Sequence, residues 1–462
     1  MPGHVDRADS FRVAGWAITA ERRGSEVVEI FVDGASVATV LASRFRIALR
    51  DRGIAEGLCA FNHVFDNPIA TFLPTTVEVK SSSTGKTLGP GPIIVPPLLA
   101  NGTDYNINLD STFYTASVRS ISVSELVSKV SVLVLGPRSA KLNVAVNPRE
   151  LELLEQSVLP GNTGPWRINE SLGKPVVCWN VSFQVRHRKN PGAQFAIASI
   201  EDRAQDSSST PTPQTIPLGV CIPCGTTWLE LPSAEHWSRI ASPGMTAEMF
   251  AAGGVNSAYK ITAIAKKYLP AKRGITVVDW GVGCGRVAVP LKRIFLPNAT
   301  VIGYDVDEFN IEWCKNQLSD VRAETCDYFP PLELAAQSVD LMYGISVMTH
   351  LTQAAQEIWL REIKRIMKPN GVCILSVHGD YSLLGNRGFS PIVFQQLKAF
   401  GISDISYNWD GLGPKLSLKG YYRGTFQLRQ QVEEAWSKHF QIVEYLPAAN
   451  ELNQDFVVLK RI

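Results

Sequence analysis

The chain has 462 residues, of which 45% are hydrophobic and 19% are charged; this composition is typical of globular domains and argues against wholesale disorder. Its 45 basic and 43 acidic residues leave a formal net charge of +2, which gives no electrostatic reason to expect nucleic acid as a partner. At roughly 150 residues per domain, the length predicts about three domains.

The sequence has no clear signal peptide, membrane-spanning segment or disulfide pattern. The polar first ten residues do not read as a signal peptide, and no apolar run approaches the roughly 20 residues of a membrane-spanning helix. The eight cysteines have no disulfide-framework spacing, which predicts a reducing, cytoplasmic setting. Cys221 and Cys224 form a single C-x-x-C pair, which we interpret as structural, and we expect no metal. Peripheral association with a membrane is compatible with these features.

Residues 1–96 have the pattern of a small β domain. An alternating run over 28–32 ends at Asp33-Gly34, a hairpin signal, and strand character resumes from Ser36. The Pro- and Gly-rich stretch 88–97 predicts a linker. We therefore predict a β-sandwich module over 1–96.

This module resembles one that recurs in bacterial glycosyltransferases and cell-surface polysaccharide proteins. The resemblance rests on V-D-R-A-D-S-F-R-V-A-G-W-A (5–17), V-E-I-F-V-D-G (28–34), A-S-R-F-R (42–46) and G-L-C-A-F (57–61). It implies a glycan or a glycosyltransferase as partner, with Trp16, Arg44 and Arg46 as a sugar platform. The alternative is that Trp16 packs in the core while the arginines form solvated ion pairs.

Residues 100–235 also have β character. The run 176–185 alternates over ten residues, as a half-buried antiparallel strand does. We predict a second β-sandwich domain here and assign it no chemistry.

From about 240 to 462 helical and strand patterns alternate, which predicts a parallel, doubly wound α/β sheet of Rossmann-like type. The expected helices are 247–268, 286–296, 307–318 and 352–367, and the expected strands are 275–280, 300–305, 339–343 and 371–377. Two further strands, 440–445 and 455–460, end the sequence.

The most informative stretch is 275–286, where a strand ends in Asp279 and runs into Gly281, Gly283 and Gly285. Glycines in such a turn supply positive φ and let backbone approach a ligand. The spacing fits neither the G-x-G-x-x-G dinucleotide pattern nor a phosphate-binding Walker loop. An acid directly before the loop suits a cofactor with positive charge, such as S-adenosylmethionine.

A second acid, Asp305, ends the strand 300–305 and follows Gly285 by 20 residues. A carboxylate in this place can accept hydrogen bonds from both hydroxyls of a ribose. The two acids and the loop therefore predict a nucleoside-containing cofactor at one edge of the sheet.

In order and spacing, the sequence resembles the class I S-adenosylmethionine-dependent methyltransferases from about 245 to 462. The motifs are D-W-G-V-G-C-G-R-V (279–287), G-Y-D-V-D (303–307) and S-V-D-L-M-Y-G-I-S-V-M-T-H-L-T (338–352). The resemblance implies that Asp279 binds the cofactor ammonium, that Asp305 binds its ribose and that Asp327 meets its adenine amino group. The alternative for Asp327 is a solvated acid in a loop. One departure is at 424–427, where a histidine-bearing Thr-x-His pattern is expected.

Further candidate residues follow the fourth and fifth strands. Tyr343 and Gly344 end the fourth strand, at the edge where ligands bind in open α/β sheets, and are candidate cofactor-binding residues. His350 and His378 are candidate general bases for a hydroxyl acceptor, and His378 is slightly preferred. The alternative for each histidine is a structural role.

A narrower resemblance points to a bacterial methyltransferase subset associated with surface-polysaccharide synthesis. It rests on I-E-W-C-K-N-Q-L (311–318), F-P-P-L (329–332), S-V-H-G (376–379) and N-Q-D-F-V-V-L-K (453–460). It implies methyl transfer to a sugar hydroxyl. The alternatives are a protein or small-molecule acceptor, or a non-catalytic glycan-binding scaffold.

Overall fold

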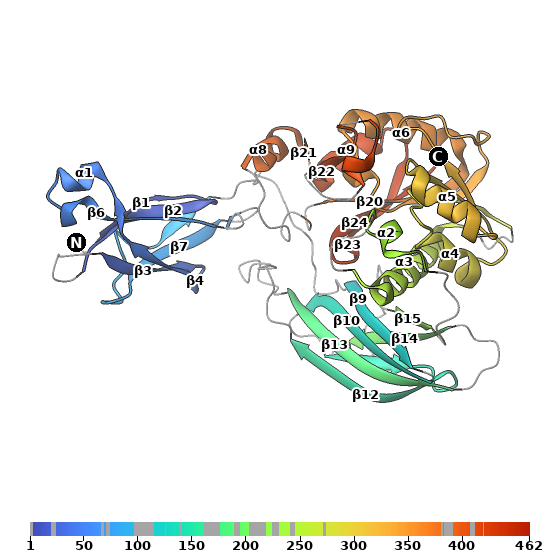
Figure 1. Cartoon of the computed structure of the whole chain (residues 1–462), viewed down its shortest axis with the longest axis horizontal. Helices are drawn as coiled ribbons and strands as arrows, with labels where there is room; N and C mark the ends of the chain where they lie inside the picture. Colours follow the sequence, from blue (N-terminus) through green and yellow to red (C-terminus); the bar gives the residue numbers. More distant parts are fainter. Residues whose placement is uncertain are drawn as a thin grey trace. The chain divides into compact units, whose positions relative to one another are not determined.

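A computed structural model places the chain in two compact units (Figure 1). The first comprises Met1–Asn108 and Asn386–Ala399, and the second comprises Leu109–Gly385 and Phe400–Ile462. The structure describes residues 3–19, 25–65, 69–70, 74–96, 115–124, 126–137, 141–160, 176–188, 195–202, 219–223, 231–240, 245–270, 274–379, 382, 391–406, 412–418 and 420–462. In these segments, no helix combines the length and hydropathy that crossing a membrane requires.

The first unit is built on two antiparallel four-stranded sheets, ordered β1-β2-β6-β5 and β4-β3-β7-β8. Apolar residues of both sheets share one core, to which Val13, Ile30 and Val79 contribute. The β-rich character expected for this region is confirmed, and its sandwich form stays a prediction. The elements are β1 (Gly3–Ala8), β2 (Arg12–Ala17), β3 (Glu26–Val32), β4 (Ala35–Ala42), β5 (Arg44–Phe45), α1 (Ile47–Arg50), η1 (Ala55–Gly57), β6 (Leu58–Val64), β7 (Thr75–Ser81), β8 (Ile93–Val95) and α8 (Pro391–Phe400).

The second unit begins with another β-rich region, in sheets ordered β12-β13-β10-β9 and β11-β14-β15. Alternate residues of these strands, such as Val130, Val132 and Val134, point into a common core, as the period of two requires. The elements are β9 (Thr115–Ser124), β10 (Val127–Pro137), β11 (Leu142–Val146), β12 (Leu151–Pro160), β13 (Val176–His187), β14 (Phe195–Asp202) and β15 (Gly219–Pro223).

The α/β region follows within the same unit. Its elements are α2 (Ala234–Trp237), α3 (Ala247–Tyr268), β16 (Thr276–Trp280), α4 (Ala288–Pro290), η3 (Leu291–Phe295), β17 (Thr300–Asp305), α5 (Glu308–Gln317), β18 (Arg322–Thr325), β19 (Val339–Gly344), η4 (Met348–His350), α6 (Gln353–Ile366), β20 (Met367–Val377), β21 (Ile402–Ser406), η5 (Gly413–Lys415), β22 (Arg423–Gln427), α9 (Arg429–Trp436), β23 (Gln441–Asn450) and β24 (Gln454–Lys460).

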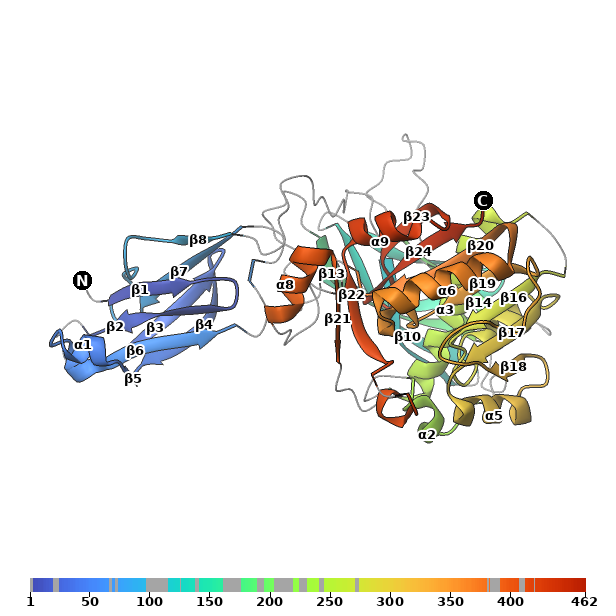
Figure 2. The same ribbon diagram turned by 90° about the horizontal axis from the view of Figure 1, so that it is seen from above.

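The predicted doubly wound sheet is confirmed, with seven strands in the order β18-β17-β16-β19-β20-β24-β23. The strands from β18 to β20 are parallel, and β24 and β23 are antiparallel at the edge. Residues alternate between two cores, because Val277 faces α3, α4 and α5 while Val278 faces α6 and α9. Figure 2 shows α6 lying along this sheet.

The helix predicted over 286–296 differs from the observed chain, which has only the short α4 followed by a π-helical turn. Pro290 ends α4 and has no N–H to donate, so the regular hydrogen-bond ladder cannot continue through it. By contrast, α6 begins at a Thr352 cap whose hydroxyl accepts from the amide of Ala355 at 3.2 Å, as predicted.

Helix α3 belongs to both halves of the second unit (Figure 1). Ala252 on α3 lies in the core of the β-rich region, while Ile261 and Ile264 lie in the core of the seven-stranded sheet. The amide of Cys221 in β15 donates to Asn256 Oδ1 at 3.1 Å. This sharing explains why the two regions form one compact unit.

Candidate active site

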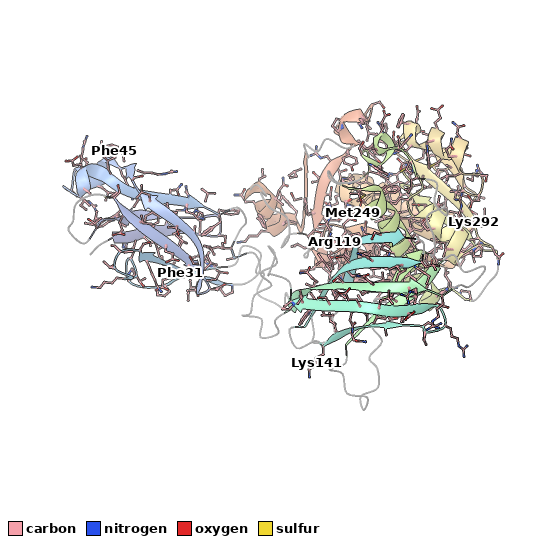
Figure 3. All side chains as sticks on the ribbon, turned by 60° about the horizontal axis from the view of Figure 1, so that its bottom comes forward. Phe31, Phe45, Arg119, Lys141, Met249 and Lys292 are labelled. Atoms are coloured by element: carbon pink, nitrogen blue, oxygen red, sulfur yellow. The ribbon has the colours of Figure 1, made fainter. Side chains whose placement is uncertain are left out.

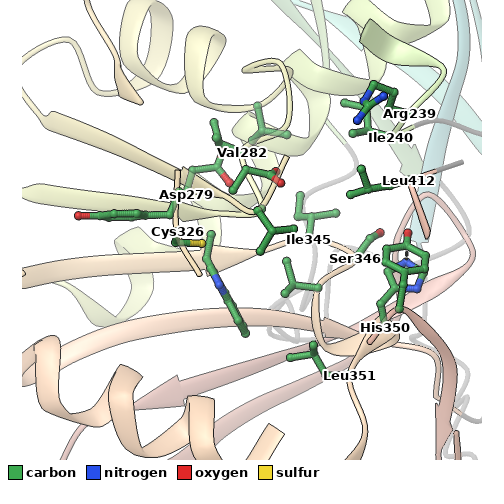
Figure 4. A pocket seen from close by; sticks show the side chains of 18 of the residues that line it. Arg239, Ile240, Asp279, Val282, Cys326, Ile345, Ser346, His350, Leu351 and Leu412 are labelled. Carbon is green, nitrogen blue, oxygen red and sulfur yellow. Dashed lines mark hydrogen bonds between the residues drawn. The ribbon is translucent and has the colours of Figure 1, made fainter. Parts of the chain in front are cut away.

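A pocket opens where β16, β17 and β19 end, at the point where the strand order of the parallel sheet reverses. Ligands bind at such switch points in doubly wound sheets. Figure 4 shows Asp279 and Val282 on one side of this pocket and Ser346 and His350 on another. The described lining residues are Arg239, Ile240, Asp279, Trp280, Gly281, Val282, Arg286, Val287, Tyr304, Asp305, Val306, Cys326, Ile345, Ser346, Val347, His350, Leu351, Trp359, Leu412, Tyr421 and Tyr422.

The glycine loop has the left-handed backbone that its sequence predicts. Gly281 has φ +83°, Gly283 φ +53° and Gly285 φ +78°. A Cβ on Gly281 would come within 2.5 Å of Val347 Cγ2, which is too close for two carbon atoms that are not bonded to each other, so one side chain would have to shift. Of the three glycines, Gly281 lines the pocket, whereas Gly283 and Gly285 shape the turn behind it.

Asp305 holds the glycine loop against the end of β17. Its Oδ2 accepts the amide N–H of Gly283 at 2.7 Å, and its Oδ1 accepts that of Asp307 at 2.9 Å. Burial raises the pKa of Asp305 to about 6, although both of these N–H donors act to lower it. Asp305, which we predict to bind the ribose, therefore lines the pocket and also holds the glycine loop in place.

Asp279 is 3% exposed at the end of β16, and Tyr343 donates its hydroxyl proton to Asp279 Oδ2 at 2.8 Å. Burial raises the pKa of Asp279 to about 7, and the hydroxyl of Tyr343 acts in the opposite direction. A carboxylate has about four acceptor sites, so this acid keeps the capacity to accept from an ammonium group. Tyr343 and Gly344 are not among the described lining residues; Tyr343 orients Asp279 from behind.

Asp327 is exposed and lies in a polar hollow next to the pocket. This hollow shares Arg239, Val306 and Cys326 with the pocket and also includes Lys415. The placement is compatible with the predicted contact to an adenine amino group, which stays a prediction.

Arg239 lines the pocket and was not predicted from the sequence. Its guanidinium forms two hydrogen bonds of 2.6 Å to the carboxylate of Asp307, a bidentate arrangement of a strong kind. It also lies 5.0 Å from the ring centroid of Phe309. The pair fixes the segment 231–240 beside the start of α5, and Ile240 thereby contacts the glycine loop at Gly283.

His350 is the predicted base candidate that lines the pocket. Its Nδ1–H donates to the carbonyl of Arg423 at 2.8 Å, so its Nε2 accepts from the Tyr422 hydroxyl at 2.8 Å. Burial lowers the pKa of His350 to about 3, so the ring is neutral at physiological pH. Tyr422 lines the pocket beside it and was not singled out in the sequence.

His378 lies behind His350 and Tyr422 and is not among the described residues that line the pocket. Its ring stacks on Phe426 with 4.8 Å between centroids, and burial lowers its pKa to about 4. Gln454 connects it to the pocket, because the amide nitrogen of Gln454 lies 3.4 Å from His378 Nε2 and donates to Ser346 Oγ at 2.8 Å. Its role as a base stays a prediction, and its position favours support of Ser346.

The unusual Gly424–Gln427 segment has a structural explanation. Gln427 is 1% exposed, and its side-chain amide exchanges hydrogen bonds of 2.9 and 3.0 Å with that of Gln356 on α6. A histidine at this position would lose the reciprocal pair. The departure from the expected Thr-x-His pattern therefore ties β22 to α6.

Residues 277–371 match the family model described as "Methyltransferase domain". The chain therefore contains an S-adenosylmethionine-dependent methyltransferase domain. The matched segment contains Asp279, the three glycines, Asp305 and His350, whereas Arg239 and Tyr422 of the pocket lie outside it.

Solved methyltransferase structures are similar to part of the chain. A SAM-dependent methyltransferase from Aquifex aeolicus shares 16% identity, with 44% of this chain and 89% of that one covered, at a TM-score of 0.28. Magnesium protoporphyrin IX methyltransferase from Synechocystis PCC 6803, with bound SAH, shares 16% identity over 49% and 94%, at a TM-score of 0.32.

The residues of the pocket fit S-adenosylmethionine. Asp279 offers a buried carboxylate to an ammonium, and the Cβ-free loop at Gly281 leaves room for close backbone approach. Asp305 offers oxygen acceptors at the end of the next strand. Bound there, the cofactor supplies an activated methyl group.

The remaining candidates from the sequence lie in other places. Trp16 is partly buried and packs against the cluster of Ile18, Leu49, Cys59 and Ala60, which favours the core interpretation over a sugar platform. Cys221 is buried in β15, and Cys224 lies outside the described residues.

Proposed function

We propose that this methyltransferase O-methylates a hydroxyl group of a sugar in a bacterial surface polysaccharide or its precursor. The observation that carries the proposal is the uncharged, hydrogen-bonding wall formed by Ser346, His350 and Tyr422. The charged residues among the described lining are Arg239, Asp279, Arg286 and Asp305, which belong to the glycine-loop side or to the segment 231–240. A neutral hydroxyl acceptor matches such a wall better than an ammonium or a carboxylate.

The residues of this wall can orient an acceptor and manage its proton. His350 Nδ1–H is held by a backbone carbonyl, so Nε2 is the basic atom that faces Tyr422. An acceptor hydroxyl that hydrogen-bonds to the Tyr422 oxygen is connected through it to His350 Nε2. The low pKa of His350 makes it a weak base, so orientation and water exclusion supply more of the rate than proton abstraction.

Apolar groups complete the chamber. Trp280 and Trp359 pack with 4.8 Å between ring centroids at an interplanar angle of 44°, and Leu351 and Leu412 are both less than 10% exposed. These side chains exclude water from the place where the methyl group is transferred, which favours transfer over hydrolysis. A protein or small-molecule acceptor with a hydroxyl group remains the alternative substrate class.

The β-rich N-terminal module is proposed to bind the glycan or a partner glycosyltransferase, on the basis of its sequence resemblance. The presence of a methyltransferase domain supports a catalytic function for the chain more than the alternative of a non-catalytic glycan-binding scaffold.

The test is a methyl-transfer assay with purified full-length protein, labelled S-adenosylmethionine and a panel of nucleotide sugars and oligosaccharides. Label in a sugar fraction, with the methyl ether located by mass spectrometry, is the expected result. A rate of labelling that falls in Tyr422→Phe, with unchanged cofactor binding, would assign the wall to the acceptor. Label on protein or on non-sugar acceptors alone would overturn the sugar assignment.

A further inference from the structure

The N-terminal module carries three large apolar side chains that are about half exposed. Phe45 is 56% exposed, Ile47 57% and Leu58 47%. Phe45 and Leu58 are directly paired across β5 and β6, so their side chains project from the same face of the sheet. Figure 3 shows Phe45 at the end of the module that carries α1 in Figure 1. Clustered exposed apolar groups of this size mark interaction surfaces.

Arginines surround these apolar groups. Arg44, Arg46, Arg50 and Arg52 are exposed within nine residues of the chain, and the Arg50 guanidinium lies 5.9 Å from the ring centroid of Phe45. Within residues 43–58 the acidic residues are Asp51 and Glu56, so four positive and two negative charges give this segment a net charge of +2. The patch is therefore both apolar and basic.

Two of these arginines form an ion pair within the module, and the other two are available to contact an anionic partner. Arg46 pairs with Asp6, and Arg50 pairs with Asp51 at 2.9 Å. Among the described residues, Arg44 and Arg52 have no ion-pair partner. The available charge thus lies on either side of α1, next to Phe45 and Ile47.

The patch is held on a rigid base. Leu49 is 3% exposed and packs with Ile18, Cys59 and Ala60 in a small core beneath α1. The backbone amide of Arg46 donates to the carbonyl of Gly57 at 2.8 Å. The backbone that carries the exposed apolar side chains is consequently already ordered before a partner binds.

We propose that this patch, formed by Phe45, Ile47, Leu58 and the four arginines, binds the surface of a membrane that contains anionic lipids. Apolar side chains that enter the acyl boundary, together with basic groups that contact lipid phosphates, are the combination that interfacial binding requires. Guanidinium groups recognise phosphate particularly well. A neutral glycan would leave the net positive charge of the patch without a counter-charge.

The experiment is a vesicle flotation assay with the full-length protein. Vesicles of phosphatidylcholine alone are compared with vesicles that contain about 30% phosphatidylglycerol, at low and high salt. Wild-type protein is expected to float with the anionic vesicles and to dissociate from them at high salt, because charge screening weakens the attraction. Equal binding to both kinds of vesicle, or binding to neither, would overturn the proposal.

Two double variants separate the charge from the apolar contribution. R44Q/R52Q removes two available charges and is expected to weaken binding about 30-fold, while F45S/I47S is expected to weaken it at any salt concentration. I94S removes an apolar side chain that is 72% exposed on β8 and should bind as wild type does. If neither double variant loses binding relative to I94S, the patch is not the site.

Protein partners are distinguished in the same set of proteins. Light scattering of wild type and F45S/I47S reports whether the patch joins two copies of the chain. A dimer that dissociates in F45S/I47S, combined with no flotation of the wild type, would assign the patch to self-association and contradict the membrane proposal. Thermal melting confirms that each variant is folded. If one double variant does not fold, the other is sufficient for the test.

Discussion

Replacement of Asp279 by asparagine tests the chemistry of the cofactor site. Asparagine keeps an oxygen that can accept from the Tyr343 hydroxyl, so the buried hydrogen bond of 2.8 Å has a substitute and only the charge is lost. A hydrogen bond to a charged group contributes about 1.5–3 kcal/mol, so D279N should bind S-adenosylhomocysteine roughly 10- to 100-fold more weakly than wild type at pH 8.

The pH dependence gives a sharper result. With a pKa of about 7, Asp279 is roughly 90% ionised at pH 8 and roughly 10% ionised at pH 6. Because an ammonium group binds the ionised form, the affinity advantage of wild type over D279N should shrink about tenfold between these values. The ionisation of the ligand affects both proteins and cancels in this ratio.

The assay is calorimetric titration of both proteins with S-adenosylhomocysteine at pH 6, 7 and 8. Tyr343→Phe is the matched control, because it removes the donor that lowers the pKa of Asp279 and should move the midpoint to higher pH. An affinity ratio that stays constant across this range would refute the assigned role of Asp279.

Asp279 also affects the stability of the unliganded protein, because a carboxyl whose folded pKa lies above its unfolded value destabilises the folded state as pH rises from about 4 to about 7. D279N should therefore melt at a higher temperature than wild type at pH 8. Equal melting temperatures would argue against the raised pKa. Tyr422→Phe leaves His350 Nε2 without its hydrogen-bond donor and should lower kcat about 10- to 100-fold. Its dissociation constant for S-adenosylhomocysteine should be unchanged, which separates the acceptor wall from the cofactor site. Gly281→Ala should lower cofactor affinity and melting temperature, whereas Gly34→Ala, at a similar φ of +79° but in open space, should cost only about 1–2 kcal/mol. Gln454→Leu should raise KM for the acceptor more than it changes cofactor affinity, as measured by steady-state kinetics.

The parallel sheet could be predicted from the sequence because its signals are local. The buried strands are short apolar runs, and Asp279 and Asp305 follow them directly, so strand ends and candidate ligands were found together. The glycine turn was also predictable, since three residues at positive φ require Gly at those positions. Each of these features is encoded within about ten consecutive residues.

The acceptor wall could not be predicted in this way. Tyr422 and His350 are hydrogen-bonded across 72 positions of sequence, and Arg239 reaches Asp307 across 68. Neither tyrosine nor arginine occurs in a motif that indicates these contacts. The two histidines looked alike in the sequence, because each follows a parallel strand, and only the path of the loop after β19 brings His350 to the pocket.

The sharing of α3 limits how this chain can be divided or recombined. Gly254 lies so close to the loop after β16 that a Cβ there would come within 2.2 Å of the carbonyl oxygen of Arg286. Ala252 on the same helix also completes the core of the preceding β-rich region. A fragment that starts at α3 would expose Ala252 and leave Asn256 without its partner on β15, and a foreign β domain joined before α3 would have to reproduce that contact surface. The β-rich region and the catalytic region should therefore be inherited, expressed and engineered as one piece.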